Sequence, residues 1–186
     1  MQNIISQAKI LEVVRQATAD TLRVDVAQVR PECSFVQNLG LESLDFLDIN
    51  YRLEQAFGLK MARHFYLEHV EDMFGEGKAI DERGRLTAAA IQLIRIRYGD
   101  QNLPQLADGL EMEQVPALIT VQSIVDVVSG ILDTMPERCA CGASAWKTED
   151  GTHIVCGACG ARAPLTNGDD LTRSWLAQVQ AEHRLF

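Results

Sequence analysis

The sequence predicts a mainly helical protein with a small C-terminal module built on a β-hairpin and four cysteines. Three observations predict this class. Apolar residues recur at helical spacing through the first 135 residues. Aromatic residues make up only 6 % of the 186 residues, which favours an aliphatic, helical core. Four of the five cysteines fall after residue 138, around an Asp-Gly turn signal.

Five helices are expected before residue 136, each with an apolar stripe at 3.6-residue spacing. They run over about 4–22, from just after Gly40 to Gly58, and over 66–74, 88–98 and 121–132. Thr87 and Thr120 are placed to cap the last two of these helices. Residues 24–38 read as a loop, and Asp108-Gly109 reads as a turn.

The second of these helices carries many apolar residues, which we expect to form one broad apolar face. They are Leu44, Phe46, Leu47, Ile49, Tyr51, Leu53 and Phe57.

The end of the chain has a different pattern. Residues 146–148 and 153–155 flank Asp150-Gly151, and an Asp-Gly pair between two short runs predicts a hairpin. Asp169 or Asp170 is placed to cap a closing helix that continues to about Arg184. Since Pro136 would end the preceding helix, we expect two domains, 1–135 and 136–186.

Composition excludes several functional classes. The chain has 26 acidic and 17 basic residues and a formal net charge of −9, which argues against nucleic acid as a partner. Pro116 and polar residues interrupt the apolar stretch 115–132, which argues against membrane insertion. Lys9, Glu12 and Arg15 interrupt the first apolar pattern, which argues against a signal peptide. We therefore expect a cytoplasmic protein.

Ser43 lies where the first loop meets the second helix. Gly40 permits a tight turn before it. A serine on an exposed first turn lies beside free backbone N–H groups, which favour a bound phosphate. The acidic residues around it are expected to form an exposed face, and they are Glu42, Asp45, Asp48 and Glu54.

Three roles for Ser43 can be distinguished. As a hydrolytic nucleophile it would need a base, and the histidines at 64, 69, 153 and 183 suggest no triad. As a simple N-cap it would lack a full capping box, because position 46 is Phe. As a modification site it would receive its chemistry from another enzyme.

The cysteines occur as Cys139-Ala140-Cys141-Gly142 and Cys156-Gly157-Ala158-Cys159-Gly160. Two such pairs around a hairpin resemble a zinc ribbon, in which four thiolates hold a structural Zn²⁺. A tail of this size has few apolar residues to bury, so it needs a bound metal ion to stabilise its fold. The first pair has one residue fewer than the common C-x-x-C. This leaves open His153 in place of one ligand, a rubredoxin-like iron, or a redox pair.

The stretch Gly40-Leu41-Glu42-Ser43-Leu44-Asp45 resembles the signature of the acyl carrier proteins, Gly-x-Asp-Ser-Leu-(Asp/Glu). Residues 120–128 are similar to the start of that family's last helix. The resemblance implies an acyl-carrier-like four-helix bundle that is not an enzyme. It implies that a phosphopantetheinyl transferase, using magnesium, joins the Ser43 hydroxyl to the 4′-phosphopantetheine of coenzyme A. The thiol of that group would hold acyl groups as thioesters for fatty-acid, polyketide or lipid biosynthesis.

The resemblance also implies partners. The face of the second helix that carries Glu42, Leu44, Asp45 and Asp48 would dock on basic patches of acyl-loading, condensing or acyl-transfer enzymes. Charges at the edge of such a contact mainly set the encounter rate and the choice of partner.

Two departures from the family pattern matter. Glu42 stands where the family has Asp. Ser43 and Thr120 are 77 residues apart, which indicates an insertion of about 61–110, as in long, specialised bacterial carriers. The insertion would add core, a larger pocket or a partner surface.

Two other classes compete with an acyl carrier. One is a zinc-ribbon adaptor or regulatory protein without a prosthetic group, in which Ser43 is never modified. The other is an aminoacyl or peptidyl carrier, which shares the same motif. The ribbon itself would stabilise the chain or bind another protein.

Overall fold

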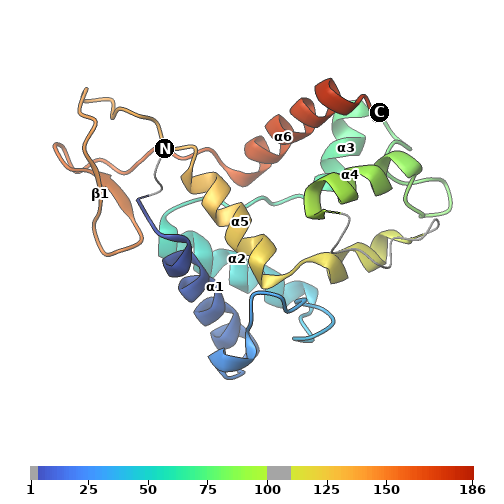
Figure 1. Ribbon diagram of the computed structural model, residues 1–186, viewed down its shortest axis with the longest axis horizontal. Coiled ribbons are helices and arrows are strands. Elements are labelled where there is room, and N and C mark those ends of the chain that lie inside the picture. Colours follow the sequence, from blue (N-terminus) through green and yellow to red (C-terminus); the bar gives the residue numbers. More distant parts are fainter. Residues whose placement is uncertain (1–3, 100–109) are drawn as a thin grey trace. The chain divides into compact units, whose positions relative to one another are not determined.

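Figure 1 shows the computed structural model of the chain, which describes residues 4–99 and 110–186. The fold class is confirmed, since the described residues are mainly helical and carry a small hairpin with four clustered cysteines and then a closing helix. The chain forms two compact units. We call Met1–Met61 with Ile119–Gly168 the first unit, and Ala62–Leu118 with Asp169–Phe186 the second unit.

The α-helices of the first unit are α1 (Gln7–Leu22), α2 (Ser43–Phe57) and α5 (Val121–Leu132). Helix α1 packs against both α2 and α5 (Figure 1). Each helix buries an aliphatic stripe, as its periodicity predicts. The buried apolar residues of the three helices include Ile10, Val14, Ile49, Leu53, Phe57, Val121, Ile124, Val125, Val128, Ile131 and Leu132.

Capping residues set the helix ends. Helix α1 begins later than expected from periodicity because the Ser6 hydroxyl caps it by accepting the N–H of Lys9 at 3.2 Å. Thr87 and Thr120 cap their helices as predicted, and Gly58 ends α2 with φ +66°. The predicted turn at Asp108-Gly109 lies outside the described residues.

The long loop that precedes α2 is tied to the start of α5. The Phe35 N–H donates to the Ile119 carbonyl, and the Val121 N–H donates to the Cys33 carbonyl, both at 3.0 Å. This loop contains a short 3-10 helix, η1 (Val26–Gln28), and its Phe35 side chain is buried. The chain that enters α2 is therefore fixed by backbone bonds and by a buried aromatic ring.

The predicted hairpin is present in the first unit. Strands β1 (Trp146–Thr148) and β2 (Ile154–Cys156) pair antiparallel, with Trp146 opposite Cys156 and Thr148 opposite Ile154. In the turn, the Asp150 carboxylate accepts the N–H groups of Thr152 at 3.1 Å and His153 at 2.9 Å. An Asp side chain that bonds to the backbone two and three residues later stabilises such a turn.

The second unit has its own hydrophobic core. Its helices are α3 (Tyr66–Phe74), α4 (Ala88–Tyr98), the 3-10 helix η3 (Met112–Leu118) and, from its second residue on, α6 (Gly168–His183). The fully buried apolar residues of this core include Leu67, Val70, Ala79, Ala90, Leu93, Ile94, Val115 and Leu176. The closing helix α6 thus packs with the insertion. The expected division into 1–135 and 136–186 stays a prediction about domains.

The predicted cap of the closing helix was wrong. Helix α6 begins at Gly168, so Asp169 and Asp170 lie in its first turn. Sequence spacing placed a capping residue there without showing what else its carboxylate contacts. Asp169 instead accepts hydrogen bonds from residues near α3, as described below.

Candidate functional site

Ser43 is the first residue of α2, and the N-cap is Glu42, with extended φ and ψ of −101° and 167°. The alternative that Ser43 is simply the N-cap is therefore wrong. The Asp45 carboxylate accepts the Glu42 N–H at 2.9 Å, which is half of a capping box. The sequence analysis considered only a box that begins at Ser43, whereas the capping box in the structure begins one residue earlier, at Glu42.

The Ser43 hydroxyl faces solvent. Its residue is exposed, and within the described residues its side chain has no hydrogen-bond partner. No base therefore contacts it in the part of the chain that the structure describes. It lies in the first turn of a 15-residue helix, where backbone N–H groups lack helical partners and attract anions. This geometry suits a hydroxyl that an external enzyme modifies with a phosphate-containing group.

The expected acidic face of α2 is partly used inside the first unit. Glu54 was expected to be exposed, and this was wrong: it is 4 % exposed, and its carboxylate accepts the Met61 N–H at 3.0 Å. Asp48 accepts the Thr21 hydroxyl at 2.7 Å and the Arg52 guanidinium at 2.8 Å. The hydrogen bond from Arg52, followed by that from Thr21, lowers the pKa of the Asp48 carboxyl.

The expected single apolar face of α2 is in fact two faces. Ile49, Leu53 and Phe57 are buried in the core of the first unit. The other face is exposed, with Leu44 at 78 %, Leu47 at 56 % and Tyr51 at 58 % of their full accessible surface. These three residues, which we call the exposed stripe, begin next to Ser43. Helical spacing placed them together correctly but did not show that they point away from the core.

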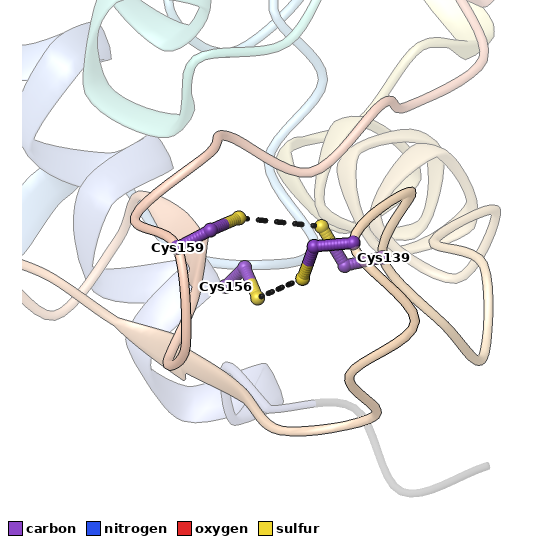
Figure 2. Close-up of side chains that lie close together, drawn as sticks. Cys139, Cys156 and Cys159 are labelled. Atoms are coloured by element: carbon purple, nitrogen blue, oxygen red, sulfur yellow. Dashed lines mark hydrogen bonds between the residues drawn. The ribbon is translucent and has the colours of Figure 1, made fainter.

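The four cysteines of the tail meet at one point. Figure 2 shows the sulfur atoms of Cys139, Cys156 and Cys159 pointing toward one another. The Sγ atoms of Cys139 and Cys159 are 3.7 Å apart, as are those of Cys141 and Cys156. All four lie within 4.8 Å of one another.

These distances match a tetrahedral four-sulfur metal site and not a disulfide. Four thiolates about 2.3 Å from a tetrahedral Zn²⁺ lie about 3.8 Å from one another, whereas a disulfide brings two sulfurs to about 2.05 Å. The backbone N–H groups of Cys159 and Ala158 lower the pKa of the Cys156 thiol. The Cys141 N–H lowers the pKa of Cys139, but burial and the neighbouring thiols together raise it to about 11. The donor set therefore fits a closed, four-sulfur metal site. His153 lies outside the group of four.

The hairpin contacts the end of α2 through His153. A Cβ atom placed on Gly58 would lie 2.9 Å from Cδ2 of the His153 ring. The ring is itself held by the Asp150 carboxylate, 2.7 Å from Nδ1. Gly58 was predicted only as a C-cap. Nothing in the sequence indicated that the His153 ring packs against it.

A second side-chain cluster lies in the second unit. His64, His69 and Asp169 each offer one ligand atom, and these atoms lie within 4.8 Å of one another. Asp169 lies about a hundred residues after the two histidines, so no local sequence motif predicts this cluster.

Comparison with known proteins identifies the family. Residues 12–70 match the family model described as the phosphopantetheine attachment site. Over 57 residues the chain is 39 % identical to an acyl carrier protein of Rubrobacter xylanophilus, which covers 31 % of this chain and 70 % of that protein. The chain belongs to the acyl carrier protein family.

Other family members match the same part of the chain. The acyl carrier protein of Thermosynechococcus vestitus is 40 % identical over 57 residues, or 31 % of this chain and 70 % of that protein. The acyl carrier protein AcpXL of Mesorhizobium japonicum is 36 % identical over 59 residues. That match covers 32 % of this chain and 63 % of AcpXL, which is less than two thirds of its length. None of the solved structures matches the chain.

Family membership confirms the coarse functional prediction. Acyl carrier proteins carry a phosphopantetheine attachment site and are not catalysts, so the chain is a carrier and not an enzyme. Carrier domains in general interact with phosphopantetheinyl transferases and acyl-processing enzymes. Ser43 lies within the matched segment. Among the described residues, the helices are all too short or too polar to cross a membrane.

Proposed function

We propose that this carrier holds acyl groups on a 4′-phosphopantetheine attached to Ser43. The observation that carries the proposal is the exposed Ser43 hydroxyl, which has no hydrogen-bond partner within the described residues and begins α2 inside the matched segment. A phosphopantetheinyl transferase needs such a free hydroxyl. Glu42, in place of the family's Asp, keeps the negative charge next to it.

The residues at the start of α2 suit the group that they would hold. The first N–H groups of the helix and its dipole would stabilise the phosphodiester. Asp45, bonded to the Glu42 N–H, stabilises the first turn, which carries Ser43. When bound, the group supplies a thiol that carries acyl chains as thioesters.

Acyl groups are the cargo that the relatives favour. The matched proteins are named acyl carrier proteins, and none of those reported above is named an aminoacyl or peptidyl carrier. The pathway is fatty-acid, polyketide or lipid biosynthesis, in a reducing cytoplasm where the cysteine thiols stay free of disulfides.

The docking surface in this proposal lies along α2. Glu42 and Leu44 are exposed beside Ser43, and Asp45 and Asp48 keep negative charge on the same helix. Acyl-loading, condensing and acyl-transfer enzymes would meet this surface with basic and apolar patches. The bonds to Thr21 and Arg52 make Asp48 a weaker contact than its sequence position suggests.

The four cysteines complete the proposal as a structural zinc site. Cys139, Cys141, Cys156 and Cys159 would all be ligands, and a full set of four thiolates leaves no open position for catalysis. Since His153 packs over Gly58, the loaded ribbon would support the end of α2. The ribbon is a part of the first unit, with a stabilising role.

Intact-mass measurement tests the proposal. The full chain is produced together with a broad-specificity phosphopantetheinyl transferase, whose activity is checked on an established carrier. We expect the mass of one phosphopantetheine to be added to the wild type and to none of the Ser43→Ala protein. Ser6→Ala, which removes another exposed serine at a helix start, is the matched control and should be modified fully. An unmodified wild type beside a modified established carrier would favour the adaptor alternative.

A further inference from the structure

His64, His69 and Asp169 of the second unit converge although two of them are far from the third in sequence. Asp169 Oδ1 lies 2.9 Å from His69 Nε2 and 3.5 Å from His64 Nδ1. The His69 side chain is fully buried in α3, whereas His64, just before α3, is exposed. Two imidazole nitrogens and a carboxylate oxygen are the donors of many three-ligand metal sites.

We propose that His64, His69 and Asp169 form a second metal site, which takes Zn²⁺ with a solvent molecule as fourth ligand. In a tetrahedral zinc site with bonds of about 2.0–2.1 Å, the ligand atoms lie about 3.3 Å apart. The two distances from Asp169 Oδ1, 2.9 Å and 3.5 Å, lie on either side of that value. All three donor atoms lie within 4.8 Å of one another, so side-chain rotations would bring them to a shared metal ion.

The carboxylate of this site is already held in place. Asp169 Oδ2 accepts the N–H of Arg63 at 3.0 Å, and Oδ1 accepts the N–H of His64 at 3.1 Å. Hydrogen bonds of this kind orient a metal-binding carboxylate and are part of a working site. They also fix the backbone of His64 next to the carboxylate that its ring approaches.

The position of the proton on the His69 ring determines which nitrogen is free to bind a metal ion. Arg173 Nε donates to His69 Nδ1 at 3.4 Å, so Nε2 carries the ring proton and donates it to Asp169. When Zn²⁺ binds Nε2, that proton leaves and Nδ1 takes up a proton, so the imidazole stays neutral. Nδ1–H then faces the guanidinium of Arg173, which has no acceptor. Arg173 therefore weakens the site, and metal binding displaces it from His69.

A metal ion bound at this site would stabilise the second unit. The site would join the start of α3 to the first turn of α6. A ligand that binds only the folded state raises its stability by RT ln(1 + [L]/Kd), so the free energy of unfolding keeps rising with the concentration of free metal. This site is separate from Ser43 and from the four cysteines, so the inference does not rest on the proposed function.

Cobalt titration tests the inference. The full chain is first loaded with one equivalent of Zn²⁺, which the four thiolates bind in preference to the nitrogen and oxygen donors of the second site, and the binding of added Co²⁺ is then followed by its visible spectrum. We expect about one further equivalent to bind, with the weak bands of nitrogen and oxygen ligands and no sulfur charge-transfer band. His64→Ala should abolish this binding. His64 is exposed, so the variant should keep its fold.

Two more variants sharpen the test. His183→Ala removes another exposed histidine of the second unit and should leave Co²⁺ binding unchanged. Arg173→Gln places an acceptor where Arg173 now donates, so it should tighten Co²⁺ binding about tenfold, the usual size of an outer-shell effect. Absence of a further equivalent would overturn the proposal. So would equal binding by His64→Ala, or weaker binding by Arg173→Gln.

Discussion

Among single residues, Gly58 has two functions in one position. Its φ of +66° belongs to the left-handed region, where a Cβ is unfavourable. The same Cβ would lie 2.9 Å from the His153 ring, which is held by Asp150. The end of α2 and the hairpin therefore depend on the absence of a side chain here.

Gly58→Ala is expected to lower the free energy of unfolding by more than about 1 kcal/mol, because both the backbone conformation and the ring contact oppose alanine. Urea denaturation measures this change. In a His153→Ala background the ring contact is gone, so the same substitution should be less harmful. Equal losses in the two backgrounds would mean that the His153 contact contributes nothing.

Prediction from sequence worked for the position of Ser43 at a helix start and failed for the burial of Glu54. The motif placed Ser43 at the start of a helix, because Gly40 and the apolar spacing after it are local signals. Glu54 is buried because its carboxylate accepts the Met61 N–H, and Met61 lies beyond the end of α2. The residues around Glu54 in the sequence do not show that Met61 folds back against it.

At the scale of one element, α2 combines a buried face and the exposed stripe. Leu53 lies fully in the core, whereas Leu47 is more than half exposed on the same helix. The two leucines thus form a matched pair in one helix, of the same residue type but on opposite faces.

Leu53→Ala is expected to cost about 2–5 kcal/mol of unfolding free energy, since it leaves a cavity. Leu47→Ala should change it by less than about 0.5 kcal/mol, as is usual for surface positions. Thermal or urea unfolding measures both. A large loss from Leu47→Ala would contradict the exposed position of the stripe.

Helix ends were easier to predict than helix faces. Thr87 and Thr120 have the residue type of a cap and lie directly before an apolar run, and the structure has them as caps. The faces of α2 required knowledge of what α1 covers. Leu44, Leu47 and Tyr51 are as apolar as the residues that α2 buries, so periodicity alone put all of them on one apolar face.

For the whole molecule, metal content is the measurable consequence of the four-cysteine group. We expect about one Zn²⁺ per chain from these four sulfurs, and Cys156→Ser/Cys159→Ser should lose it. Chelation should lower the melting temperature, because small metal modules lose their fold without metal. Zinc retained by the double variant would contradict the assignment of the four cysteines as the zinc ligands. Measuring zinc per chain in the His64→Ala variant excludes any zinc bound at the second proposed site.

The broad organisation could be predicted from the sequence, and the membership of α6 could not. Five helices, the hairpin and the four-cysteine group follow from periodicity, turn residues and spacing. Leu176 of α6 is buried among residues of α3 and α4, which lie far away in the sequence. Its apolar pattern showed that α6 needs a partner but not which one.

The central claim is that Ser43 carries the prosthetic group, and fragment-ion mass spectrometry tests it most directly. Chain free of the group is treated in vitro with coenzyme A, magnesium and a phosphopantetheinyl transferase, and the modified protein is fragmented. The account predicts one phosphopantetheine, placed on Ser43 by the fragment ions on either side of it. The group on any other residue, or an unmodified chain beside a fully modified established carrier, would contradict it.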